Sequence, residues 1–268
     1  MNQIHAANRR HWDGHLAEVF QKHSEAAKRW QRCSTEPELA FDCEALQVID
    51  EFVGELTGKK VCLVGSGDNH AAFALAGLGA HLTSVDQSAK QLETASRRAS
   101  KLGLPITFTQ ADATDMGTLP STSFDLVCST NGFFVWLADL PRLFAEIQRL
   151  LKPGGFYIFY DIHPFQRPWK NDTLEMEKPY FETGPIHPKD EGPYFFHWTM
   201  GDVLNALADG GLALRRLKEC PARDSANWLS DHYYKPGASP ELLDWRINPL
   251  TGLPYWLLVA AEKKGIDD

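Results

Sequence analysis

The 268-residue sequence has no apolar run long enough to cross a bilayer and fewer basic than acidic side chains. A membrane span needs roughly 18 successive apolar residues, and neither the first 20 residues nor any later window approaches that. The 27 basic and 35 acidic side chains give a formal net charge of −8, whereas nucleic-acid binding relies on an excess of Lys and Arg. We therefore expect a cytoplasmic protein with neither a membrane nor a nucleic acid as partner.

The cysteines are odd in number and irregularly spaced, and no two have the CxxC spacing of a zinc or redox site. They are Cys33, Cys43, Cys62, Cys128 and Cys220. We interpret them as reduced thiols that help to fill the core. His11 and His15 have the i, i+4 spacing of two metal ligands on one helix, but no third ligand has matching spacing, so we expect no metal site.

Residues 1–57 are expected to form amphipathic helices with a break near residues 34–37. From Lys60 onward, short apolar runs alternate with helical patterns. We predict strands at 61–65, 81–86, 106–110, 124–129 and 156–161, and helices at 69–78, 88–102 and 139–151, with Ser88 as an N-cap. This alternation indicates βαβ units, and therefore an α/β, doubly wound fold whose mostly parallel sheet is covered on both faces.

Irregular stretches interrupt the pattern after the fifth and sixth strands. They span 162–199 and 219–252 and flank a predicted helix at 200–208 and strand at 212–217, and a last strand follows at 255–263. We thus predict a Rossmann-like, seven-stranded domain of residues 58–268 with residues 1–57 as a helical cover. Of the aromatic side chains, 8 Trp, 7 Tyr and 15 Phe in all, half lie between Tyr160 and Trp256, which suits an apolar substrate pocket and equally a second packing layer.

The turn after the first strand reads Gly65-Ser66-Gly67 and precedes a helix. Its glycines permit a sharp turn and a close approach of the backbone to a ligand, and the helix offers free N–H groups. Asp86 ends the second strand, where a carboxylate would accept hydrogen bonds from ribose hydroxyls. Together these features indicate a nucleoside ligand.

Further motifs narrow the choice of nucleoside. Asp112 closes the third strand, where an adenine amino group could donate to it, and the runs FDLV (124–127) and LKPGG (151–155) follow in order. Over residues 56–161, this set resembles the S-adenosylmethionine-dependent methyltransferases of the Rossmann-like class I. The resemblance implies S-adenosyl-L-methionine as cofactor.

The resemblance also implies which residues contact the cofactor, from its methionine part through its ribose and adenine to the sulfonium. These are Gly65, Ser66, Gly67, Asn69, Asp86, Gln87, Asp112, Ala113, Ser129 and Asn131. Two positions depart from the family's pattern, because Leu63 replaces an acidic residue and Asn69 replaces a third glycine. Asp68, Asn69 or an N-terminal side chain is then expected to compensate by holding the amino end of the cofactor or ordering the loop.

Methyl transfer from a sulfonium requires alignment and exclusion of water, and a general base only for a hydroxyl or protonated amine. The candidate bases are Asp161 and His163 near the end of the fifth strand and, as the alternative, His197 on the first insertion. Tyr160 and Arg167 lie at the same place in the sequence as further candidate bases or substrate contacts. The N-terminal helix with Trp12 is expected either to close over the cofactor or simply to dock against the sheet.

After the fourth strand the chain reads Ser129-Thr130-Asn131-Gly132, without the Asn-Pro-Pro-aromatic pattern of enzymes that methylate nucleobase amines. We therefore predict transfer of a methyl group to an oxygen or nitrogen of a small-molecule metabolite or natural product. A catalytically silent methyltransferase-like binding module is the first alternative, which Leu63 and Asn69 favour. The second is a NAD(P)-dependent oxidoreductase, which shares the glycine turn and the ribose acid. The sequence carries no signal for the oligomeric state.

Overall fold

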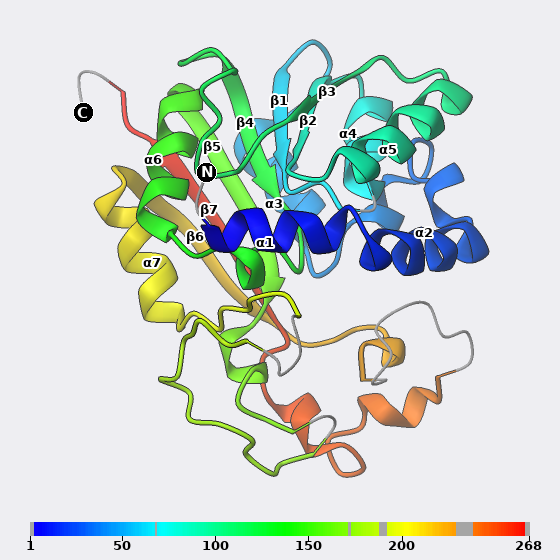
Figure 1. Ribbon diagram of the computed structural model, residues 1–268, viewed down its shortest axis with the longest axis vertical. Helices are drawn as coiled ribbons and strands as arrows, with labels where there is room; N and C mark the ends of the chain where they lie inside the picture. Colours follow the sequence, from blue (N-terminus) through cyan, green and yellow to red (C-terminus); the bar gives the residue numbers. More distant parts are fainter. Residues whose placement is uncertain (1–2, 68, 171–172, 188–191, 229–237, 266–268) are drawn as a thin grey trace.

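The computed structural model describes residues 3–67, 69–170, 173–187, 192–228 and 238–265 (Figure 1). Its centre is a seven-stranded sheet in the order β3-β2-β1-β4-β5-β7-β6. The strands are β1 (Lys60–Val64), β2 (His81–Asp86), β3 (Ile106–Gln110), β4 (Phe124–Ser129), β5 (Leu151–Ile162), β6 (Leu212–Cys220) and β7 (Trp256–Lys263). Neighbours pair in parallel except for β7, which is antiparallel to both β5 and β6. This confirms the predicted α/β class and the mostly parallel sheet.

Helices cover both faces of the sheet because successive side chains on each strand point to opposite faces. On β1, Val61 and Leu63 pack in the apolar cluster of α3 and α4, whereas Cys62 and Val64 pack in that of α6 and α7. The α-helices of the described residues are α1 (Gln3–Trp12), α2 (His15–Ala27), α3 (Ala45–Val53), α4 (His70–Gly77), α5 (Ala89–Leu102), α6 (Leu140–Leu150) and α7 (Met200–Asp209). The sheet is therefore doubly wound.

The strands β2, β3 and β4 have the predicted bounds, whereas β5 begins at Leu151 instead of residue 156. Leu151 pairs with Phe124 ahead of a bulge in the β4–β5 ladder. A Cβ on Gly155 would lie 2.9 Å from the carbonyl oxygen of Lys152 and 3.1 Å from that of Phe124, so the bulge requires glycine there. The Lys-Pro-Gly-Gly segment is therefore the bulged start of the strand instead of a separate turn.

The N-terminal helices α1 and α2 cross the carboxyl ends of the strands (Figure 1). At their junction, Asp13 accepts a hydrogen bond of 2.7 Å from the hydroxyl of Ser88, the predicted N-cap of α5. The predicted break near residues 34–37 is wider in the structure, since only two short 3-10 turns, Arg29–Gln31 and Pro37–Ala40, lie between α2 and α3. Within residues 1–57, α1 and α2 thus cover the edge of the sheet, whereas α3 packs on its face.

The described parts of the two insertions lie together beyond the same carboxyl edge (Figure 1). The sixth strand continues to Cys220, so the second insertion begins later than predicted. Because α1 and both insertions meet at this edge, they can enclose a ligand site there. None of the helices in the described ranges has the length and apolar character that a membrane span requires.

Candidate functional site

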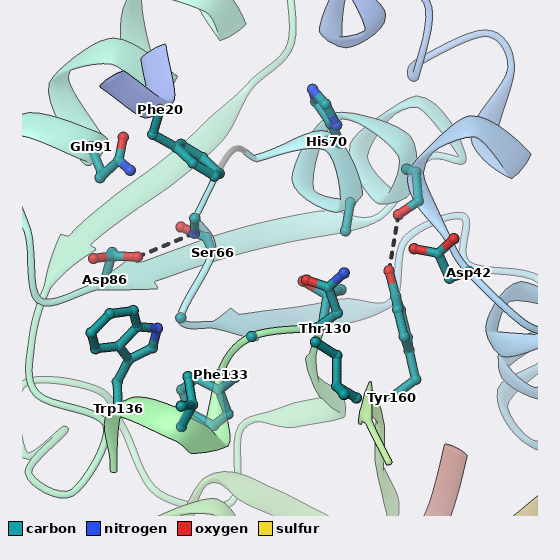
Figure 2. Close-up of a pocket in the computed structure, with 18 of the residues that line it drawn as sticks. Phe20, Asp42, Ser66, His70, Asp86, Gln91, Thr130, Phe133, Trp136 and Tyr160 are labelled. Carbon is teal, nitrogen blue, oxygen red and sulfur yellow. Dashed lines mark hydrogen bonds between the residues drawn. The ribbon is translucent and has the colours of Figure 1, made fainter. Parts of the chain in front are cut away.

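A cavity of about 1280 Å³ lies at the carboxyl edge of the sheet. Its walls come from the loops after β1, β2, β3, β4 and β5, from α1 and α2, and from both insertions. Figure 2 places Asp86, Gln91 and Trp136 on one side and Asp42 and Tyr160 on the other. The side of Asp86 is called the nucleoside half below, and the region lined by Tyr160, Arg167, Phe195, His197, Asn227, Tyr255 and Trp256 is called the acceptor half.

The loop after β1 approaches the cavity through its backbone. Gly65 and Gly67 have φ values of +67° and +49°, a region in which glycine is favoured. A Cβ on Gly65 would lie 2.3 Å from the ring of Phe133, so this position also requires a bare backbone. Ser66, between the two glycines, is 3% exposed and lines the cavity. The loop is therefore built so that a ligand can lie directly against main-chain atoms.

Asp86 holds this loop and also faces the cavity. Its carboxylate accepts the N–H of Gly67 at 3.2 Å and that of Ser88 at 2.8 Å. Burial raises the pKa of Asp86 to about 6, although the N–H groups of Ser88 and Gly67 act in the opposite direction. A desolvated carboxylate with spare lone pairs is suited to hydroxyl donors, which agrees with the predicted ribose contact.

Asp112 lines the same half of the cavity and is fixed by α1. His5 donates from Nδ1 to both carboxylate oxygens at 2.9 and 3.0 Å, and its Nε2 accepts the N–H of Ala138 at 2.8 Å. Burial alone would raise the pKa of Asp112, but the hydrogen bonds from His5 and Thr114 outweigh it and lower the pKa to about 2. The two donors of Thr114 both reach Oδ1, so Oδ2 retains room for a further donor from the cavity.

Several residues that line the cavity carry a buried polar atom without a hydrogen-bond partner among the described residues. In the nucleoside half these are Ser66 Oγ and Gln91 Nε2, and in the acceptor half they are His197 Nδ1 and Asn227 Nδ2. Buried polar groups in proteins are nearly always satisfied. Orphaned atoms on both sides of one cavity are therefore the mark of a polar ligand that extends across it.

Most of the sequence-predicted cofactor contacts do line the cavity. They are Gly65, Ser66, Gly67, Asp86, Gln87, Asp112, Ala113 and Asn131. Asn69 lies beneath the loop instead, where its amide donates to the carbonyl of Gly67 at 2.8 Å and accepts from the hydroxyl of Ser84 at 3.2 Å. Asn69 thus orders the loop, one of the two expected compensations. Asp68 lies outside the described residues.

Ser129 is absent from the cavity wall, because its hydroxyl points into the core. It shares a 2.6 Å hydrogen bond with the hydroxyl of Tyr157, and the two residues are 2% and 0% exposed. Burial raises the pKa of Tyr157, so this phenol stays protonated. The next residue, Thr130, lines the cavity instead.

Of the three candidate bases, only His197 lines the large cavity. The carboxylate of Asp161 is turned toward the loop after β4, where it accepts N–H groups of residues 132–134 at 2.7–3.0 Å. His163 is fully buried, pairs with Glu219 at 2.9 Å and accepts the N–H of Phe165. The geometry therefore gives Asp161 and His163 positions that support the wall of the cavity, and it disfavours both as bases.

Sequence reasoning missed several residues of the wall. Gln91 lies in the first turn of α5, three residues after the N-cap Ser88, and lines the cavity. Its place in the helix that follows Asp86 is the sequence signal that could have identified it. His5, Phe20 and Asp42 reach the cavity from the N-terminal region. Nothing in the spacing of these residues indicates that they lie beside the strand ends.

Comparisons with known proteins identify a family that agrees with the sheet and the cavity described above. Residues 63–159 match the model of the methyltransferase domain family. The chain is 29% identical over 146 residues to a ubiquinone biosynthesis O-methyltransferase of Aromatoleum aromaticum, a match that covers 54% of this chain and 62% of the relative. It is 31% identical over 126 residues to a demethylmenaquinone methyltransferase of Leptospira interrogans, which covers 46% of this chain and 49% of the relative. The chain thus spans less than two thirds of both relatives.

The crystal structure of an S-adenosylmethionine-dependent methyltransferase from Mesorhizobium loti is similar over more of the chain. It is 26% identical, with a TM-score of 0.61, and the match covers 82% of this chain and 98% of that one. These findings and the seven-stranded sheet support a class I S-adenosylmethionine-dependent methyltransferase, with the methyltransferase domain at residues 63–159. The cofactor of this family is S-adenosyl-L-methionine, and the orphaned polar atoms and the bare glycine loop fit such a ligand.

Proposed function

We propose that this protein transfers a methyl group from S-adenosylmethionine to an oxygen or nitrogen of a small-molecule acceptor. The observation that carries the proposal is one continuous cavity with two chemically different halves. One half has the glycine loop and two carboxylates suited to an adenosine, and the other has aromatic walls with a few polar groups. A continuous cavity lets two ligands meet without water between them.

In the nucleoside half, Asp86 would accept the ribose hydroxyls and Oδ2 of Asp112 the adenine amino group. Gln91 Nε2, buried without a partner, would donate to the same nucleoside. On the opposite side of the cavity, Asp42 lines the wall on the same side as Tyr160 (Figure 2) and would supply the negative charge that Leu63 lacks. The backbone of Gly65 and Gly67 would then lie beneath the part of the cofactor that joins its adenosine to its amino end.

When bound, S-adenosylmethionine supplies an activated methyl group, and the protein mainly aligns the acceptor with it. Burial, together with the nearby cations Arg167 and Lys178, lowers the pKa of His197 to about 3. A group of such low pKa is neutral at physiological pH and is a weak general base. His197 is therefore proposed as a hydrogen-bonding residue that orients the acceptor. We also propose that the acceptor is a small molecule and that the protein acts in the cytoplasm.

The test is a transfer assay with S-adenosylmethionine that carries a tritiated methyl group, run against a panel of phenols, aromatic amines and aromatic acids. We expect label in at least one acceptor and none with Asp86→Ala, while Glu93→Ala, which removes an exposed carboxylate of α5, transfers normally. S-adenosylhomocysteine should raise the melting temperature, and NAD and NADP should not. Binding of S-adenosylhomocysteine without transfer to any acceptor would instead favour a silent binding module.

A further inference from the structure

The acceptor half of the cavity contains a half-buried cation that has no ion-pair partner among the described residues. Arg167 follows the short helix Pro164–Gln166 and lines the cavity. Within the described residues its guanidinium makes neither a hydrogen bond nor an ion pair. Burial lowers the pKa of Arg167, although Asp161 acts in the opposite direction, and an arginine nevertheless stays charged at neutral pH. The fold thus maintains a partly desolvated positive charge beside the place where the acceptor would lie.

Asp161 lies close enough to act electrostatically on Arg167, but it forms no ion pair with the guanidinium in the described structure. Both carboxylate oxygens of Asp161 are engaged by backbone N–H groups, so its lone pairs are directed at the loop after β4. The other charged neighbour is a second cation, because Arg167 contributes to a lowered pKa of Lys178 as well as of His197. Lys178 donates to the carbonyl oxygens of Pro179 and Glu182 and pairs with no carboxylate of the described chain. Neither cation is therefore held in an ion pair with a carboxylate of the described residues, although Asp161 acts electrostatically on Arg167 and Glu182 on Lys178.

The orphaned atoms of the acceptor half suit the same kind of ligand. His197 Nδ1 and Asn227 Nδ2 are buried without partners among the described residues, and both side chains belong to the wall that also holds Arg167. Tyr255 links Asn227 and Arg167 on this wall. Its hydroxyl donates to the carbonyl of Asn227 at 3.1 Å, and it lies close enough to Arg167 to interact electrostatically. An amide N–H₂ and a guanidinium can only donate, so their common partner is an acceptor oxygen, and a charged oxygen would also compensate Arg167.

Aromatic rings lie around these donors, and Trp136 joins them from the nucleoside half (Figure 2). Trp136 and Phe195 are in contact, with ring centroids 5.0 Å apart, and Tyr160 and Trp256 are in contact at 5.6 Å. All four line the cavity. Such walls suit a flat apolar molecule. Arg167 would then select for the polar substituent that this molecule carries.

We propose that the methyl acceptor is an aromatic compound that carries an oxyanion, a carboxylate or a phosphate, and that Arg167 binds this oxyanion and determines substrate specificity. The inference rests on the proposed function and refines it by naming the acceptor class. The planar fork of Arg167 matches the two oxygens of a carboxylate or phosphate. His197 and Asn227 lie beside it as further hydrogen-bonding groups.

The test uses benzoate, phenyl phosphate and the neutral, similarly shaped benzamide as probes. Each is titrated calorimetrically into the wild-type protein saturated with S-adenosylhomocysteine. We expect benzoate or phenyl phosphate to bind at least about tenfold more tightly than benzamide, and the tighter of the two identifies the oxyanion. Equal binding of all three probes, or no binding of either anion, would overturn the proposal.

Three variants test whether Arg167 causes the preference for the anionic probe. Arg167→Met should abolish the preference for the anion, and Arg167→Lys should weaken it, because lysine retains the charge without the fork. Arg142→Met, which removes an exposed cation of α6, should retain it in full. If Arg167→Met no longer binds S-adenosylhomocysteine, the result for Arg167→Lys is used instead. An undiminished preference of Arg167→Lys for the anion over benzamide would refute the role of Arg167. Failure of the wild type to bind S-adenosylhomocysteine would refute the proposed function, whereas binding without anion preference refutes only the acceptor class.

Discussion

Replacing His5 by alanine should both destabilise the protein and loosen α1. His5 and Asp112 are 2% and 5% exposed, and the imidazole connects Asp112 to the N–H of Ala138. Loss of a hydrogen bond to a charged partner costs about 1.5–3 kcal/mol, and a buried N–H left without an acceptor costs about 1–3 kcal/mol. Detachment of α1 would let water reach both groups and limit the loss. We therefore expect a decrease of about 3 kcal/mol in the free energy of unfolding.

The assay is thermal and urea unfolding of His5→Ala beside Arg10→Ala, an exposed position on the same helix. A loss of about 3 kcal/mol corresponds to a fall of about 6–12 °C in the melting temperature, and the control should remain within about 0.5 kcal/mol of the wild type. Limited proteolysis should cut near α1 sooner in His5→Ala.

The pH dependence provides a second measurement on the same variant. Because the pKa of Asp112 is lowered to about 2 in the folded protein, its carboxylate stabilises the fold above its ordinary pKa near 4, and this contribution is lost as the pH falls toward 2. The difference between wild type and His5→Ala should thus be largest at neutral pH and shrink below pH 4. A loss no greater than that of Arg10→Ala, or a difference that grows in acid, would refute the assigned network.

Three further substitutions test the structure of the cavity wall and of the core behind it. Gly65→Ala should weaken binding of S-adenosylhomocysteine and lower stability by about 1–3 kcal/mol, because the new methyl overlaps the ring of Phe133; unchanged calorimetric affinity would contradict the loop geometry. Asp161→Asn should lower the melting temperature and slow methyl transfer, since it disturbs the loop after β4, and wild-type values in both assays would be evidence against this positioning role. Ser129→Ala should cost about 1–3 kcal/mol by orphaning the hydroxyl of Tyr157 without changing affinity for S-adenosylhomocysteine, and a tenfold weaker affinity would return Ser129 to the binding site.

The strands of the cofactor half could be predicted from sequence because their signals are local. The bounds of β2, β3 and β4 follow from short apolar runs between turn residues, and Asp86 was placed at the cavity by its position at the end of β2. The start of β5 was mispredicted because its Pro-Gly-Gly signature suits a turn as well as a bulge. A bulge is distinguished only by pairing with Phe124, 27 residues earlier.

The remaining features depend on contacts that are distant in sequence. His5 reaches Asp112 across 107 positions, and no periodicity in α1 encodes that contact. The place of Asp161 and His163 at the end of β5 predicts candidate bases, yet the side chain of Asp161 binds a neighbouring loop and that of His163 pairs with Glu219. A position at a strand end thus locates the backbone of a candidate base but leaves the direction of its side chain to tertiary packing.

Calorimetric titration of S-adenosylhomocysteine tests the central claim most directly. The wild type and Glu93→Ala should bind one equivalent with equal affinity, whereas Asp86→Ala should bind at least about tenfold more weakly, since it loses hydrogen bonds to a charged acceptor. Burial raises the pKa of Asp86 to about 6, so wild-type affinity should fall as the pH is lowered through 6 and the carboxylate becomes protonated. Absence of binding to the wild type, or equal affinity of Asp86→Ala and Glu93→Ala, would contradict a nucleoside cofactor held by Asp86.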